Sequence, residues 1–156
     1  MSFVLAALVL IGAVVLQSVV SGIWPATSRF FDLPLIAVLY YAIVRGPGGA
    51  LMAGTGAGLL QDALGGTLLG VSALSKAVAG YLMGILALRL ALFSLISRIL
   101  VVAAATVTSR FVELATMAIM GRRLGHVSYS QLFESVPGNC LLGALILSTL
   151  KQKGPD

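Results

Sequence analysis

No Lys, Arg, Asp or Glu occurs before Arg29, so the chain opens on an unbroken apolar run. A helix that crosses a bilayer needs about 20 mostly apolar residues, and this run supplies them. A signal peptide would carry basic residues ahead of an apolar core of about 7–15 residues, whereas this run is longer and has none before it. We therefore predict an uncleaved transmembrane helix over residues 3–22, ended by an interfacial anchor at Trp24 and Pro25.

Further apolar runs follow, and the composition of the whole chain agrees with them. Of the 156 residues, 59% are hydrophobic and 10% are charged, whereas a soluble domain has about 45–50% apolar and about 25% charged residues. Six transmembrane helices would use about 120 residues, which leaves too little chain for a soluble domain of about 50 residues. We predict one all-α domain over residues 1–156, a polytopic membrane bundle of about six helices with no soluble domain.

The second apolar run is the shortest. Residues 33–44, between Asp32 and Arg45, would rise about 18 Å as a helix, which is less than a hydrocarbon core of about 30 Å. Either the flanking charges snorkel or this helix crosses only partly. Glycine and proline predict turns at residues 46–49 and 65–66. The other predicted spans cover residues 50–62, 68–88, 99–121 and 136–150.

The basic residues separate the apolar runs and form no patch. The formal net charge is +5, but this placement is typical of membrane anchors and topology signals, and we expect no nucleic-acid binding. Six spans put both termini on one side. Placing both in the cytoplasm puts more basic residues inside than outside, which the positive-inside rule favours. The inside set is Arg45, Arg89, Arg98, Lys151 and Lys153, and the outside set is Arg29, Arg122 and Arg123.

Small residues recur at intervals of four in two neighbouring spans, so each set lies on one face of its helix. Such faces let helix backbones approach closely in lipid, where packing drives association. The favoured interpretation is packing between the two spans, and the alternative is a docking face for the membrane helix of another protein. The candidate residues of this face are Ala50, Gly54, Gly58, Gly80 and Gly84.

Four charged residues lie within the apolar runs, where an isolated charge is costly and is normally paired or placed in a polar cavity. Asp62 and Lys76 flank a predicted turn at similar depth. We favour an ion pair between them, with a polar pocket for a partner or ligand as the alternative. Arg110 and Glu113 are three residues apart and share a helix face. We favour a buried pair here too, with a proton-coupled transporter that uses Glu113 as the alternative.

The chain lacks the residues that most catalytic and metal sites require. Cys140 and His126 are its only cysteine and histidine, so we expect neither an intrachain disulfide nor a His/Cys metal cluster. A serine nucleophile would need a nearby base, and His126 has no evident partner. The glycine-rich run over residues 54–58 lacks the preceding strand of a dinucleotide-binding motif. We therefore predict no enzymatic activity and no cofactor.

Several segments resemble the bacterial rod shape-determining protein MreD family, and together they cover most of the chain. Asp62, which follows Gly-Leu-Leu-Gln, is the most telling position. The chain departs from the family pattern at Pro34 in the second span and at Lys76 in the fourth. The segments that carry the resemblance are FDLPL at 31–35, GLLQDA at 58–63, Gly66 with Leu69-Gly70, GYLMG at 80–84, and PGN at 137–139 leading to Lys151.

The resemblance implies a non-enzymatic scaffold in the bacterial inner membrane, within the machinery of cell elongation and peptidoglycan synthesis. Its implied partners are the single-span protein MreC and, through MreC, the glycosyltransferase RodA and its penicillin-binding transpeptidase. The family's fold is similar to that of the substrate-binding subunits of energy-coupling-factor transporters, so a vitamin-uptake subunit is the alternative. That function needs a cavity of several hundred Å³ with a few convergent polar groups.

Overall fold

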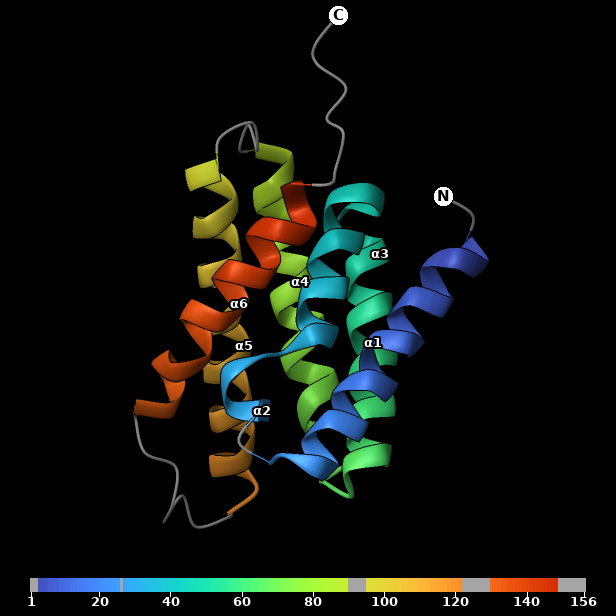
Figure 1. Ribbon diagram of the computed structural model, residues 1–156, viewed down its shortest axis with the longest axis vertical. Helices are drawn as coiled ribbons and strands as arrows, with labels where there is room; N and C mark the ends of the chain where they lie inside the picture. The colour runs from blue at the N-terminus through green and yellow to red at the C-terminus, as the bar shows by residue number, and fades with distance from the viewer. Residues whose placement is uncertain (1–2, 26, 90–94, 122–129, 149–156) are drawn as a thin grey trace, which may run out of the picture.

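The computed structural model describes residues 3–25, 27–89, 95–121 and 130–148, and every regular element in these ranges is a helix. The all-α prediction is therefore confirmed for this part of the chain. The long helices lie side by side in a bundle, with the short α2 at its edge (Figure 1). The elements are α1 (Phe3–Ile23), α2 (Thr27–Phe30), α3 (Leu33–Gly65), α4 (Val71–Arg89), α5 (Leu95–Ile119) and α6 (Ser130–Ser148).

The longest helix, α3, folds back on itself at Gly46. This residue has φ 76° and ψ −177°, a conformation that is essentially restricted to glycine. Val38 and Ala57 pack in one apolar cluster, although a straight helix would hold residues so far apart in sequence at about 28 Å. Two antiparallel parts, residues 33–45 and 47–65, therefore make up α3 (Figure 1). Pro47 suits the first turn of the second part. The chain reverses at Gly46, the first residue of the predicted turn 46–49, and residues 47–49 are already helical.

The helical segments run alternately up and down the bundle in the order α1, first part of α3, second part of α3, α4, α5 and α6 (Figure 1). The beginning of α1 and the end of α6 lie at the same end. Packing is most extensive between α3 and α4, followed by α4 with α5, α5 with α6 and α1 with α3. Four of the basic residues used to predict the orientation, Arg122, Arg123, Lys151 and Lys153, lie outside the described residues.

The first part of α3 occupies the centre of the bundle. Its side chains Leu35, Ile36, Val38 and Leu39 are at most 1% exposed. One apolar cluster joins this part to α4 and α5, and a second joins it to α1 and to the second part of α3. Because its neighbours shield it, this segment does not have to match the thickness of the lipid. Its central position explains how a helix of less than bilayer length fits into an apolar bundle.

Three helices in the described ranges are long and apolar enough to cross a membrane, which is fewer than the six spans predicted. They are α4, α5 and α3, the last with its two antiparallel parts counted together. In α1, a helix of 21 residues, the described residues Ala7–Ile23 form a further apolar helical stretch. The outer surface of α1 carries exposed large apolar side chains, among them Val4, Leu8 and Val19 at 55–66% exposure. So much exposed apolar surface suits contact with lipid, and the chain is a membrane-embedded helical protein.

Candidate functional site

The small-residue faces pack against each other inside the protein. A Cβ atom on Gly54 would lie 2.5 Å from the carbonyl oxygen of Lys76, and one on Gly58 would overlap the backbone of Ala73. Only glycine permits this approach of α3 to α4. The interpretation as internal packing is therefore confirmed, and a face open to another protein's helix is wrong for these residues. All five candidates are buried in this contact: Ala50, Gly54, Gly58, Gly80 and Gly84.

An open apolar groove of about 350 Å³ lies between α1 and the second part of α3. Its floor includes Gly56, where an added Cβ atom would meet nothing within 4 Å. Met52 borders the groove with 75% of its surface exposed. The sequence feature that could have predicted this groove is the spacing of Gly49, Ala53, Gly56 and Leu60, which follow one another at intervals of three or four residues. This spacing places them on one face of the helix, beside the buried face of small residues. We name these four residues and Met52 the α1/α3 groove.

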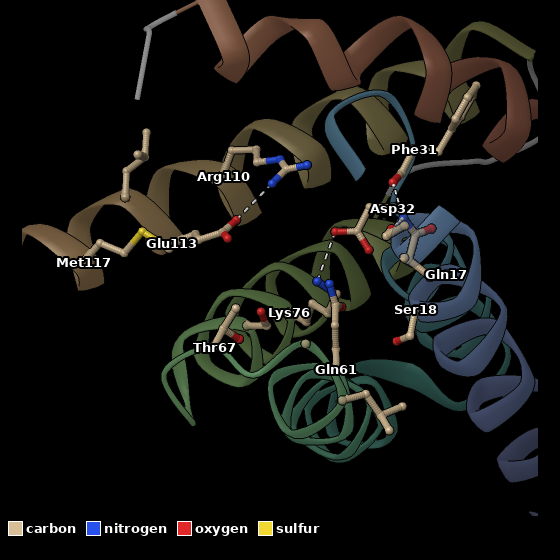
Figure 2. Close-up of a pocket in the computed structure, with 16 residues that line it drawn as sticks. Gln17, Ser18, Phe31, Asp32, Gln61, Thr67, Lys76, Arg110, Glu113 and Met117 are labelled. Carbon is tan, nitrogen blue, oxygen red and sulfur yellow. Dashed lines mark hydrogen bonds and ion pairs between the residues drawn. The ribbon is translucent and has the colours of Figure 1, made fainter. Parts of the chain in front are cut away.

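The ion pair of Lys76 is formed with Asp32, and the predicted pair with Asp62 is wrong. Lys76 Nζ lies 3.0 Å from Asp32 Oδ2, and the two side chains are 3% and 9% exposed (Figure 2). Asp32 also caps α3, because its Oδ1 accepts a hydrogen bond from the backbone N–H of Leu35 at 3.1 Å. This carboxylate therefore both begins α3 and neutralises the buried charge of α4.

Asp62 instead holds the connection between α3 and α4. Its carboxylate accepts hydrogen bonds from the backbone N–H groups of Gly70 at 2.8 Å and Ser72 at 3.1 Å, and from the hydroxyl of Thr67 at 3.2 Å. A carboxylate at the start of α4 satisfies N–H groups that the helix leaves unpaired, and it also favours the helix dipole. The most telling residue of the family resemblance therefore has a structural role that explains its identity and position.

A chain of buried hydrogen bonds extends from Asp32 to the last helix. The backbone N–H of Asp32 donates to Asn139 Oδ1 of α6 at 2.8 Å, and Asn139 Nδ2 donates to the Thr106 hydroxyl of α5 at 3.2 Å. From α1, Gln17 Nε2 donates to the carbonyl of Phe31 at 3.1 Å. Sequence reasoning missed Asn139, Thr106 and Gln17, because uncharged polar residues in an apolar run give little sign of their partners.

The predicted pair on α5 is present. Arg110 Nη1 lies 3.2 Å from Glu113 Oε2, and the side chains are 24% and 25% exposed. A pair three residues apart needs no other helix to bring it together. These side chains are not buried as predicted, because they border a pocket.

A pocket of about 560 Å³ lies at the end of the bundle where α1, α3 and α5 finish and α4 begins. Both ion pairs border it from different helices, as Figure 2 shows. Gln61 Oε1 is buried and has no hydrogen-bond partner within the described part of the chain. Leu64, Leu114 and Met117 contribute apolar surface. The pocket therefore combines paired charges, one unsatisfied acceptor and an apolar border.

The side chains of the site offer charges, hydrogen-bonding groups and apolar surface. Among the described residues no group of three or more His, Cys, Asp or Glu side chains is placed to hold a metal ion. Comparison of the chain with models of protein families, with curated proteins and with solved structures finds no match.

Proposed function

We propose that this protein is a non-enzymatic scaffold of the MreD type in the bacterial inner membrane, acting in cell elongation. The observation that carries the proposal is that segments of the family resemblance contact one another, and that one of these contacts joins residues 107 positions apart in sequence. Asp32 in the first segment bonds Asn139 in the last. Asp62 in the second bonds Gly70 in the third. A chance similarity in glycine-rich and leucine-rich runs would not be expected to join these positions.

In this proposal the six antiparallel segments cross the membrane as one bundle with both termini in the cytoplasm. The alternating direction of the segments supports this topology. The central, short first part of α3 is enclosed by the others and needs no full-length contact with lipid. The reversal of α3 at Gly46, directly after Arg45 in sequence, lies at the end of the bundle where α1 begins and α6 ends, which this orientation assigns to the cytoplasm (Figure 1).

The α1/α3 groove is the proposed site for the membrane helix of MreC. Small residues on its floor allow a second helix to approach closely, which is how helices associate in lipid. MreC held there would position RodA and its penicillin-binding transpeptidase, which need not touch this protein directly. The buried stripe between α3 and α4 then serves only to keep the groove-bearing helix in place.

The test is to fill the groove. Gly56→Leu adds a side chain where there is open space, so the protein should fold but no longer co-purify with MreC. Gly12→Leu is the matched control, because Gly12 is also an exposed helical glycine with nothing within 4 Å, and it lies outside the groove. Cells that rely on the Gly56 variant should become round, and cells with the control should remain rods. Normal MreC binding by a folded Gly56→Leu protein would contradict the assignment of the groove.

A second candidate function is a vitamin-uptake binding subunit, and the polar pocket favours it. Its volume of about 560 Å³ lies within the range of about 300–1,000 Å³ for small-molecule sites. Mass spectrometry of gently purified protein separates the two functions. An MreC-like protein at stoichiometric amount supports the scaffold, whereas a stoichiometric vitamin together with transporter subunits supports uptake.

A further inference from the structure

We propose that the pocket bordered by α1, α3, α4 and α5 binds a zwitterionic group that carries an ammonium and an anionic oxygen, and that its source is the phosphatidylethanolamine head group or a free solute of the same chemistry. This site is separate from the α1/α3 groove and does not depend on the scaffold function, but it is the same pocket that the second candidate function would use for a vitamin. Four features of the pocket carry the assignment: its balance of charge, an ion pair within reach of a ligand, an unsatisfied acceptor and an apolar border.

The charges that border the pocket sum to zero. Lys76 and Asp32 form one pair, and Arg110 and Glu113 form the other. A ligand with a net charge would leave that charge uncompensated in a site with low dielectric, which is costly in a membrane. A ligand with one positive and one negative group brings no net charge and still offers partners to both signs.

The two pairs differ in how readily they can engage a ligand. Lys76 and Asp32 are 3% and 9% exposed, and Asp32 already caps α3. Arg110 and Glu113 are 24% and 25% exposed on the wall of α5. The guanidinium of Arg110 can bind an anionic oxygen by two parallel hydrogen bonds, while the Glu113 carboxylate accepts from an ammonium. We therefore place the ligand's charged groups against α5.

The unsatisfied oxygen of Gln61 defines what the ligand must donate. A buried acceptor without a partner costs free energy, and native structures rarely leave one unpaired. Gln61 Oε1 is in this state, and Gln61 is one of the residues that line the pocket. A primary ammonium has three N–H donors and can bond both Gln61 and Glu113, whereas a trimethylammonium has none. This difference separates phosphatidylethanolamine from phosphatidylcholine.

The helices α1 and α5 stand apart on two sides of the pocket. Both helices border the pocket, yet they make no contact with each other within the described ranges. On α5, Leu114 and Met117 extend the wall with apolar side chains, and Leu64 of α3 does the same. A head group in the pocket can therefore keep its acyl chains in the bilayer, so a lipid does not have to leave the membrane to bind.

The test uses the full-length protein, stripped of lipid in detergent, with three lipids of identical acyl chains. Phosphatidylethanolamine should raise the melting temperature most, phosphatidylcholine less, and the anionic phosphatidylglycerol least. Gln61→Leu should weaken binding of phosphatidylethanolamine about tenfold in a native mass spectrometry titration, the loss expected for one charge-assisted hydrogen bond, and should leave phosphatidylcholine binding unchanged. Ser135→Ala is the matched control, because Ser135 Oγ is the other buried atom without a partner in the described residues and lies outside the pocket.

Glycerophosphoethanolamine, the head group without acyl chains, distinguishes the two sources. If it displaces the lipid at comparable concentration, the site takes a free solute; if it does not, the site is a lipid site, and both outcomes support the zwitterion. Equal stabilisation by all three lipids would overturn the proposal. Unchanged binding of phosphatidylethanolamine by a folded Gln61→Leu protein would overturn it too.

Discussion

The contact between α3 and α4 and the pocket wall on α5 each carry an ion pair, but the two regions are built in opposite ways. Lys76 and Asp32 are 44 residues apart and almost fully buried. Arg110 and Glu113 are three residues apart and about a quarter exposed. The first pair exists only because α3 and α4 pack closely against each other. The second forms within one helix and stays accessible. The exposed fraction of an ion pair, rather than its presence, therefore decides its role. The buried pair stabilises the fold, and the partly exposed pair can bind a ligand.

The largest effect is expected from breaking the buried pair. Lys76→Met keeps much of the side-chain volume but leaves the Asp32 carboxylate without its counter-ion. Removal of one partner from a buried pair costs about 3–5 kcal/mol, so the protein should lose most of its stability in detergent denaturation. The double variant Lys76→Met with Asp32→Asn should recover part of that loss. If the single variant lost less than about 1 kcal/mol, the pair would have to be hydrated.

A smaller effect, still on the α3/α4 side, is expected from two glycines that are two positions apart. Gly58→Leu forces a side chain into the backbone of Ala73, and overpacking costs about 1–3 kcal/mol or more. Gly56→Leu points into open space and should be close to neutral. The comparison is made by thermal unfolding and by the amount of each variant in the membrane. Equal losses for both variants would mean that α3 is rotated relative to this structure.

The smallest effect is expected on α5. Arg110→Leu and Glu113→Leu should each cost about 0.5–1 kcal/mol, because the pair is partly exposed and local to one helix. A double-mutant cycle with Arg110→Leu and Glu113→Leu should give a coupling of about the same size. A coupling as large as that of Lys76 with Asp32 would remove the distinction between the two regions.

The sequence predicts best those features that depend only on residues close together in the chain. Apolar runs and glycine turns predict the helices and the reversal at Gly46, because each depends on neighbouring residues. The pairing of Arg110 with Glu113 follows from helical spacing for the same reason. The number of full-length spans is harder to predict from the sequence. The short first part of α3 fits only because it lies at the centre of the bundle, and that position depends on how all the helices assemble.

The partner of Lys76 could not be predicted, because it depends on how far α3 and α4 are rotated and displaced relative to each other. Asp62 is nearer in sequence than Asp32, yet its carboxylate turns to the N–H groups of Gly70 and Ser72. Competition from backbone donors therefore decided the pairing. The pocket could not be predicted either, because its walls come from four helices. The partners of Asn139 could not be predicted because both lie on other elements.

The bond between Asp32 and Asn139 also has a consequence for the order of biosynthesis. These residues are 107 positions apart, so the ribosome adds the whole intervening segment before the Asn139 amide that accepts from Asp32 exists. Early helices can enter the bilayer and form the contact of α3 with α4, but the interior around Asp32 is completed only when α6 arrives. The hydrogen bonds around Asp32, at the start of α3, are therefore complete only after α6 has been made. A nascent chain that stops before α6 lacks the bond from Asp32 to Asn139.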